Sequence, residues 1–235
     1  MFGLLAACML AGTTAAQAQE PVIKTGFIAV NFGAQSTQHD IAISQSPIIY
    51  DEAASITTSQ AIHNGPILEI GGGYRVLENV TVGGRYSMFS GRASDSTITA
   101  QIPDPVAYGR LRPIVQTTPD LAHSEHGIHI QATWFKAVTP KFDVAVSGGP
   151  SFIRVSQDFT NVTVPAGTQT IAVTKITQTG TAIGFNTGFD GMFMFNPSYG
   201  IGAFVRYTQG KVDLPSVPGL RVGGVQSGVG FRVRF

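Results

Sequence analysis

Apolar and polar residues alternate with a period of two along most of the chain, and no other feature constrains its fold as much. In segment 225–235 the valine and phenylalanine residues fall on one face, and the glycine, glutamine and arginine residues fall mainly on the other. Successive side chains of a β-strand point to opposite faces, so this alternation predicts strands with one apolar and one polar face. The same pattern recurs in the segments 22–35, 67–76, 80–90, 127–137, 142–155, 180–195, 199–209 and 225–235.

The connections between these segments alternate between short and long. Tight turns are expected at 77–79, 139–141 and 196–198, and long polar links at 36–65, 91–126, 156–179 and 210–220. Four long links and three short turns require eight antiparallel strands with both termini on the short-turn side. Within the third link, segment 162–167 predicts a hairpin tip.

The direction of the apolar face separates a membrane barrel from a soluble, lipocalin-type barrel. The interior of eight strands is just wide enough for side chains to fill, and it cannot hold this many aromatic residues. Only 12% of the residues are charged, against about 25% in an ordinary soluble domain. The sequence therefore predicts an all-β fold, an eight-stranded antiparallel transmembrane β-barrel with short periplasmic turns and long extracellular loops. An aromatic girdle is expected near the turns, from Tyr74, Trp134, Phe142, Phe193, Tyr199 and Phe235.

The N-terminal segment has the features of an export signal. Residues 1–18 carry no charge and end in Ala16-Gln17-Ala18, the small-x-small pattern of signal-peptidase sites. We expect cleavage before Gln19, which leaves 19–235 as the barrel domain and removes the single cysteine. The alternative is a lipobox ending at Cys8, whose thiol would be acylated.

The C-terminal segment 229–235, which alternates and ends on phenylalanine, resembles the insertion signature of bacterial outer-membrane barrels, with Phe231, Val233 and Phe235 as its apolar residues. Segments 148–152 and 202–214 are similar to parts of the small barrel family that includes OmpA-like, porin-family and opacity-type domains. This resemblance implies an outer-membrane location and assembly by the barrel-insertion machinery of a Gram-negative bacterium. Members range from tethers to adhesins to lipid-modifying enzymes, so the resemblance is weak evidence for function.

Charged residues on the polar face are expected to meet inside the barrel. An unpaired ion in such a confined site costs several kcal/mol, so we expect Glu69 and Asp190 to pair with some of Arg85, Arg206 and Arg232 and to block passage. The alternative is an ion-selective pore. The predicted lumen charge network consists of Glu69, Arg75, Arg85, Asp143, Asp190, Arg206, Arg232 and Arg234.

One cluster of catalytic residue types, His123-Ser124-Glu125-His126 with His129, could form a His-Ser-Glu group or a metal site. His126 and His129 lie three positions apart at the expected start of a strand, and positions i and i+3 of a strand point to opposite faces. We therefore expect a solvated loop there and not a site. The glycine runs at 71–73, 83–84 and 148–149 do not open helices, so they predict strand curvature and not a phosphate site. No catalytic residue, cofactor or metal is predicted.

These features favour a non-enzymatic, monomeric barrel in contact with outer-membrane lipid, whose loops present a surface to an extracellular ligand. With a net charge of +1 the chain has no basic stripe for nucleic acid. An adhesin or receptor of the opacity type, a lipid A-modifying enzyme and a small diffusion pore remain as alternatives. The charged residues of the second link, the most plausible contact site, are Arg92, Asp95, Asp104, Arg110, Arg112 and Asp120.

Overall fold

The computed structural model describes residues 25–37, 39–91 and 94–235, and every element within them is a β-strand. The predicted signal peptide 1–18, with Cys8, and Arg92 of the second link lie outside the described residues. In chain order the strands are β1 (Gly26–Ser36), β2 (His39–Gln45), β3 (Ile48–Ile49), β4 (Glu52–Ala53), β5 (Ser55–Ile62), β6 (Gly65–Leu77), β7 (Val80–Ser90), β8 (Ser94–Pro103), β9 (Leu111–Leu121), β10 (His123–Thr139), β11 (Phe142–Thr163), β12 (Ala172–Met194), β13 (Tyr199–Leu214) and β14 (Val217–Arg234). Across these ranges no helix has the length and apolarity to span a membrane.

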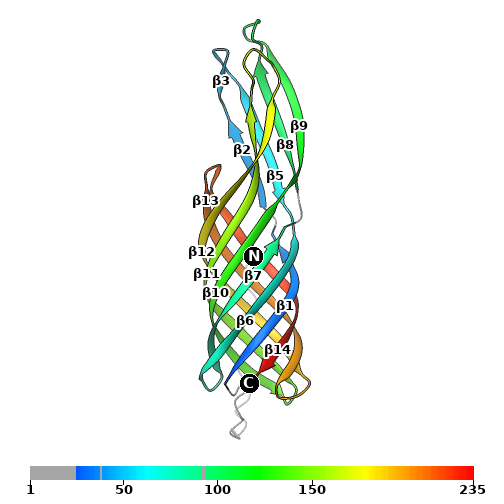
Figure 1. Cartoon of the computed structure of the whole chain (residues 1–235), viewed down its shortest axis with the longest axis vertical. Coiled ribbons are helices and arrows are strands. Elements are labelled where there is room, and N and C mark those ends of the chain that lie inside the picture. Colours follow the sequence, from blue (N-terminus) through cyan, green and yellow to red (C-terminus); the bar gives the residue numbers. More distant parts are fainter. Residues whose placement is uncertain (1–24, 38, 92–93) are drawn as a thin grey trace, which may run out of the picture.

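Eight of the strands close into an antiparallel barrel in the order β1-β14-β13-β12-β11-β10-β7-β6 (Figure 1). The predicted short turns are all present, between β6 and β7, β10 and β11, and β12 and β13. The ring closes where β1 pairs with β14, from Phe27 opposite Arg234 to Ser36 opposite Val225. The Thr25 N–H donates to the Phe235 carbonyl at 2.8 Å, which places the start of β1 and the C-terminus together at the short-turn end. The predicted eight-stranded barrel is confirmed.

The two faces of the wall are divided as the alternation predicted. The outward residues of the membrane belt are exposed and apolar, whereas the inward residues of the same strands are polar and buried. All six expected girdle aromatics are exposed on the outward face near the turns. A wall that is apolar outside and charged inside is solvated by lipid and not by water. The protein is therefore an outer-membrane β-barrel.

Glycines allow the wall strands to pack closely and leave room inside. A Cβ on Gly83 would lie 1.9 Å from the carbonyl oxygen of Gly72 on the neighbouring strand, a distance no side chain tolerates. A Cβ on Gly188 would lie 2.6 Å from Cγ of Arg206, so this glycine provides space for an arginine in the lumen. Gly83 belongs to one of the glycine runs predicted to lie within strands, and it lies in β7; Gly188, in β12, is not in one of those runs.

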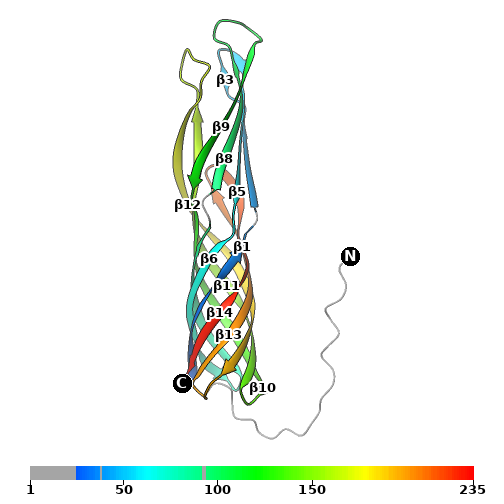
Figure 2. The same cartoon turned by 90° about the vertical axis from the view of Figure 1, so that its right-hand side faces the viewer.

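The long links are present as predicted, and most of their residues form strands. They continue as strands beyond the membrane belt and form what we call the extension: the sheet β2-β5-β8-β9, the small hairpin β3-β4 and the upper parts of β11 and β12. Figures 1 and 2 show the extension standing above the barrel along the same long axis. The predicted hairpin tip at 162–167 is present, because β11 and β12 pair up to Thr163 opposite Ala172.

Two apolar clusters explain why the links are ordered. The upper cluster lies between the sheet and the β11–β12 hairpin and contains Ala54, Ile56, Ile98, Ala100 and Ile102, with Ile49, Ile114, Val162, Val164, Ile171 and Val173 packed against it. The junction cluster joins the inner face of the barrel's extracellular end to β2 and β5. Its members are Ile41, Ile62, Ile153, Val155, Phe159, Ala182, Val212, Leu214, Leu220 and Val222. Burial of these side chains supplies the free energy that an ordered extension requires.

Strand β9 forms one edge of the sheet, and most of its residues are exposed on both faces. Pro113 and Pro119 interrupt its row of backbone donors. Proline is found at sheet edges because it cannot donate to a ladder, and it limits pairing with another chain.

Candidate functional site

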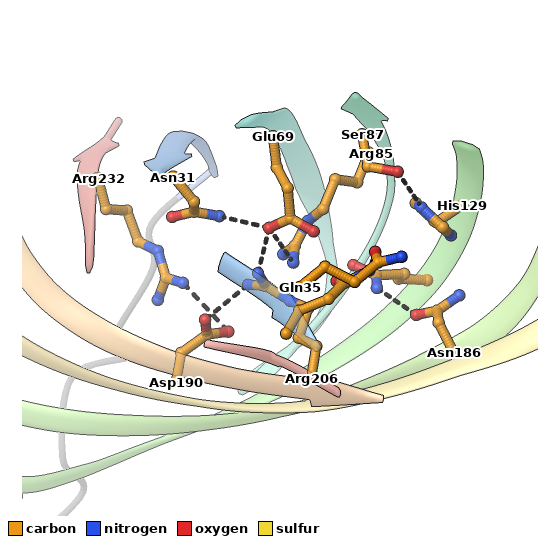
Figure 3. Close-up of polar contacts among 12 residues, drawn as sticks. Asn31, Gln35, Glu69, Arg85, Ser87, His129, Asn186, Asp190, Arg206 and Arg232 are labelled. Carbon is orange, nitrogen blue, oxygen red and sulfur yellow. Dashed lines mark hydrogen bonds and ion pairs between the residues drawn. The ribbon is translucent and has the colours of Figure 1, made fainter. Parts of the chain in front are cut away.

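The centre of the lumen holds a network of buried ion pairs that spans the barrel (Figure 3). The carboxylate of Glu69 on β6 pairs with Arg85 at 3.5 Å and with Arg206 on β13. Arg206 also binds Asp190 on β12 at 2.7 Å, and Asp190 lies 3.5 Å from Arg232 on β14. The pairing expected from the sequence is thus present in the structure, with Arg206 bridging both acids.

Four residues of the predicted network lie closer to the turns than Glu69 and Arg206 do: Arg75, Asp143, Arg232 and Arg234. Arg232 packs its guanidinium over the rings of Phe27 and Phe135, at 4.9 and 5.2 Å from their centroids. Arg234 pairs with Asp143. Arg75 is only half-buried and lies at the turn end of β6.

A second polar layer surrounds His129. Its Nε2 lies 2.8 Å from the Ser87 hydroxyl and its Nδ1 lies 2.8 Å from the Ser151 hydroxyl. The Asn186 amide donates to Ser151 at 2.8 Å and accepts from Gln131. The alternation along β7 and β10 predicts that Ser87 and His129 both face inward. Their hydrogen bond also depends on the β7–β10 register, which places Arg85 opposite His129 and which the alternation does not specify.

A third layer is built around Glu125, which the register places opposite Val155 of the junction cluster. Its carboxylate accepts from Gln35 at 3.0 Å and from the Gly223 N–H at 3.1 Å, and it lies 3.0 Å from His123 Nε2. His123 Nδ1 lies 2.6 Å from the Gln157 amide oxygen. His123 and Glu125 therefore belong to a buried part of β10, and the expectation of a solvated loop there is wrong. The segment is ordered because its side chains are buried and hydrogen-bonded to Gln35, Gln157 and Gly223.

The strand geometry separates the members of the suspected catalytic cluster. His123, Glu125 and His129 point into the lumen, whereas Ser124 and His126 lie on the outward face of β10. A nucleophile, its base and an orienting group must lie within hydrogen-bond reach of one another, and this His-Ser-Glu group is not assembled. Within residues 25–37, 39–91 and 94–235, no three histidine, cysteine or acidic side chains are placed to hold a metal ion.

Outside the membrane, Asp158 ties the second link to the β11–β12 hairpin. Its carboxylate accepts from the Ala122 N–H at 3.0 Å and from Thr177 at 2.6 Å, and it pairs with Lys175 at 2.9 Å. Lys175 also donates to the carbonyl of Asp120 at 2.6 Å, at a residue with a φ of 60°. Burial alone would raise the pKa of Asp158, but these hydrogen bonds and Lys175 hold it below its ordinary value of 3.8.

This lowered pKa predicts how the extension responds to acid. A carboxylate with a depressed folded pKa contributes stability above its unfolded pKa, and the contribution is lost as pH falls through the folded value. We expect the hydrogen-exchange protection of the Ala122 amide to fall between about pH 4 and pH 2. In Asp158→Asn the protection should be low throughout and independent of pH. Equal pH profiles for both proteins would contradict this role of Asp158.

The outermost part of the extension is a hydrogen-bonded tip at 104–110. Asp104 accepts from the Val106 N–H at 3.0 Å, and the Gly109 N–H donates to Glu52 at 2.9 Å. This ordered backbone holds Val106 and Tyr108 in solvent, with 91% and 88% of their surface exposed. From the β3–β4 turn, the Tyr50 hydroxyl donates to the Thr168 carbonyl at 2.8 Å. The tips of three links are therefore joined.

Comparisons with known proteins concern the architecture only. No family model matches the sequence, and no curated protein is significantly similar to it. Among solved structures the chain is similar to Neisserial surface protein A, with 16% identity, 89% of this chain and 97% of that chain covered, and a TM-score of 0.45. The outer membrane protease OmpT from Escherichia coli is 7% identical, with 88% of this chain and 94% of that chain covered and a TM-score of 0.41. Ail, the attachment invasion locus protein of Yersinia pestis, is 11% identical, with 88% of this chain and 97% of that chain covered and a TM-score of 0.39. The placement of this chain in the membrane rests on its own apolar belt and not on these similarities.

Proposed function

We propose that the protein is a non-conducting, non-enzymatic outer-membrane barrel that holds a rigid β-structured surface outside the cell for contact with an extracellular partner. The observation that carries this proposal is the extension, which has its own apolar cluster and tips joined by the Tyr50–Thr168 and Gly109–Glu52 bonds. Apolar side chains held in solvent by an ordered backbone are typical of contact surfaces, because they bind with little loss of conformational entropy. Such residues are present at the tip of the β8–β9 connection.

The adhesive form of this proposal is tested at Val106 and Tyr108. Cells displaying the wild-type protein should adhere to one another or to an epithelial cell layer several-fold more than cells with an empty vector. Val106→Ser/Tyr108→Ser should reduce adherence to the vector level, because aromatic anchors carry much of the energy of an interface. Val76→Ser, an exposed apolar residue beside the β6–β7 turn, is the matched control and should leave adherence unchanged. Equal adherence of all cells, including the vector cells, would count against an adhesin.

The non-conducting part of the proposal is tested by electrical recording. The arginine network fills the lumen, and the junction cluster packs across its extracellular end. We expect planar bilayers containing the purified protein to show no discrete current steps. Steps whose size changes in Arg85→Ala or Arg206→Ala would instead support the diffusion pore.

A further inference from the structure

The outward wall of the barrel carries a polar cluster at the level where the apolar belt ends on the extracellular side. On β11 the exposed Phe152 is followed two positions later by Arg154, and on β10 His126 lies two positions above Ile128. The register pairs Ile128 with Phe152 and His126 with Arg154. Directly opposite residues of an antiparallel pair have Cβ atoms about 5 Å apart, so Arg154 and His126 lie side by side, one step above the belt.

Tyr86 on β7 joins this cluster. Its hydroxyl lies 2.9 Å from Nδ1 of His126, and the two rings stack with centroids 6.2 Å apart. When the tyrosine hydroxyl donates to Nδ1, Nε2 of His126 carries the proton and is itself a donor. The cluster then offers an imidazole N–H and a guanidinium on the same outward face.

No acid balances Arg154 on this face. Its partner on β12 is Thr181, and among the described residues no carboxylate lies within ion-pair distance of its guanidinium. The next outward residues along β10 and β11 are Ser124 and Ser156. The other cation pair at this rim differs, because Lys211 opposite Arg221 has Asp213 two positions along on the same exposed face.

We propose that Arg154, His126 and Tyr86 form a binding site for the phosphate of a phosphorylated glycolipid in the outer leaflet. At the upper edge of an apolar belt, the molecules that reach the wall from the side are lipids, with their headgroups at this height. Phosphate oxygens match the donors of a guanidinium in geometry and charge. The acyl chains of the same lipid would cover Phe152 and Ile128 directly below. The inference depends on the orientation of the barrel in the membrane and not on the extension having a partner.

The test measures lipid retained by the purified, folded full-length protein in detergent micelles, using native mass spectrometry. The probes are bis-phosphorylated lipid A and the same lipid after enzymatic removal of its phosphates. We expect the wild type to bind the phosphorylated form about tenfold more tightly than the dephosphorylated form, the scale of one lost charge-assisted hydrogen bond. Arg154→Gln/His126→Gln should lose this preference, and Arg154→Lys should retain part of it. Lys211→Gln/Arg221→Gln, which removes two positive charges from the other rim pair, is the control and should bind as the wild type does.

Each alternative outcome is distinct. Equal retention of both lipids by the wild type overturns the site. Loss of preference in the Lys211/Arg221 variant but not in the Arg154/His126 variant moves phosphate binding to the other rim pair and also overturns it. Competition by inorganic phosphate at the lipid's own concentration would show a site for free phosphate, contrary to a lipid headgroup. All variants are first compared by their gel mobility with and without boiling, which reports whether the barrel is folded.

Discussion

Replacing Arg206 by leucine is expected to lower the free energy of unfolding by about 3–5 kcal/mol, the cost of breaking a buried ion pair from one side. The physical reason is that Glu69 and Asp190 both lose the cation that bridges them in the lumen. The measurement is urea-induced unfolding in lipid vesicles, followed by tryptophan fluorescence and by the gel-mobility shift.

Two further variants separate charge from packing. Glu69→Gln/Arg85→Leu/Arg206→Leu removes Glu69 together with both of its cations and leaves Asp190 paired with Arg232, and it should recover most of the loss because no uncompensated charge remains. Arg221→Leu on the exposed face of β14 should change stability by about 0.5 kcal/mol or less. If Arg206→Leu were no less stable than Arg221→Leu, the network would not stabilise the barrel.

Shortening Phe159 to alanine is expected to release the extension while the barrel stays folded. Phe159 lies in the junction cluster, where it is almost completely buried, and a buried phenylalanine-to-alanine change costs about 3–5 kcal/mol. The barrel below retains its strand pairing. Protease added to vesicles should therefore cleave the variant within the described segments 39–62 or 156–179, where the wild type resists, and should leave a protected, heat-modifiable barrel.

The matched control for this experiment lies on the same strand. Phe152 is outward-facing and lies in the lipid belt, so Phe152→Ala removes the same atoms without touching the junction cluster. It should leave the extension as resistant as the wild type. Cleavage at equal rates in the two variants would mean that Phe159 does not hold the extension.

The barrel could be predicted from the sequence because its rules are local. Parity along each segment assigns every side chain to a face, as Glu69 and Leu68 illustrate, and short polar segments such as 139–141 mark the turns. The set of inward-facing charges follows from the same parity. The contact of Arg206 with Glu69 does not, because it joins β13 to β6, which are not neighbours, and it depends on the stagger of the closed ring, which no local pattern specifies.

The extension was missed for a different physical reason. Segments such as 55–62 and 94–103 are rich in serine and threonine, which are also common in loops. Their alternation becomes informative only when Ile56 and Ile98 are seen to pack against the β11–β12 hairpin. The same omission misplaced His123 and Glu125, which are buried beside the junction cluster at the base of the extension.

The β1–β14 seam, where Phe27 lies opposite Arg234, determines at which stage of assembly the lumen network can form. Glu69 and Arg206 belong to β6 and β13, which lie on opposite sides of that seam in the ring order. Their contact can form only when the first and last wall strands have met, so it is absent while the sheet is still open. The Glu69–Arg206 contact therefore belongs to the closed ring alone, and it stabilises the closed barrel relative to every state in which the seam is open.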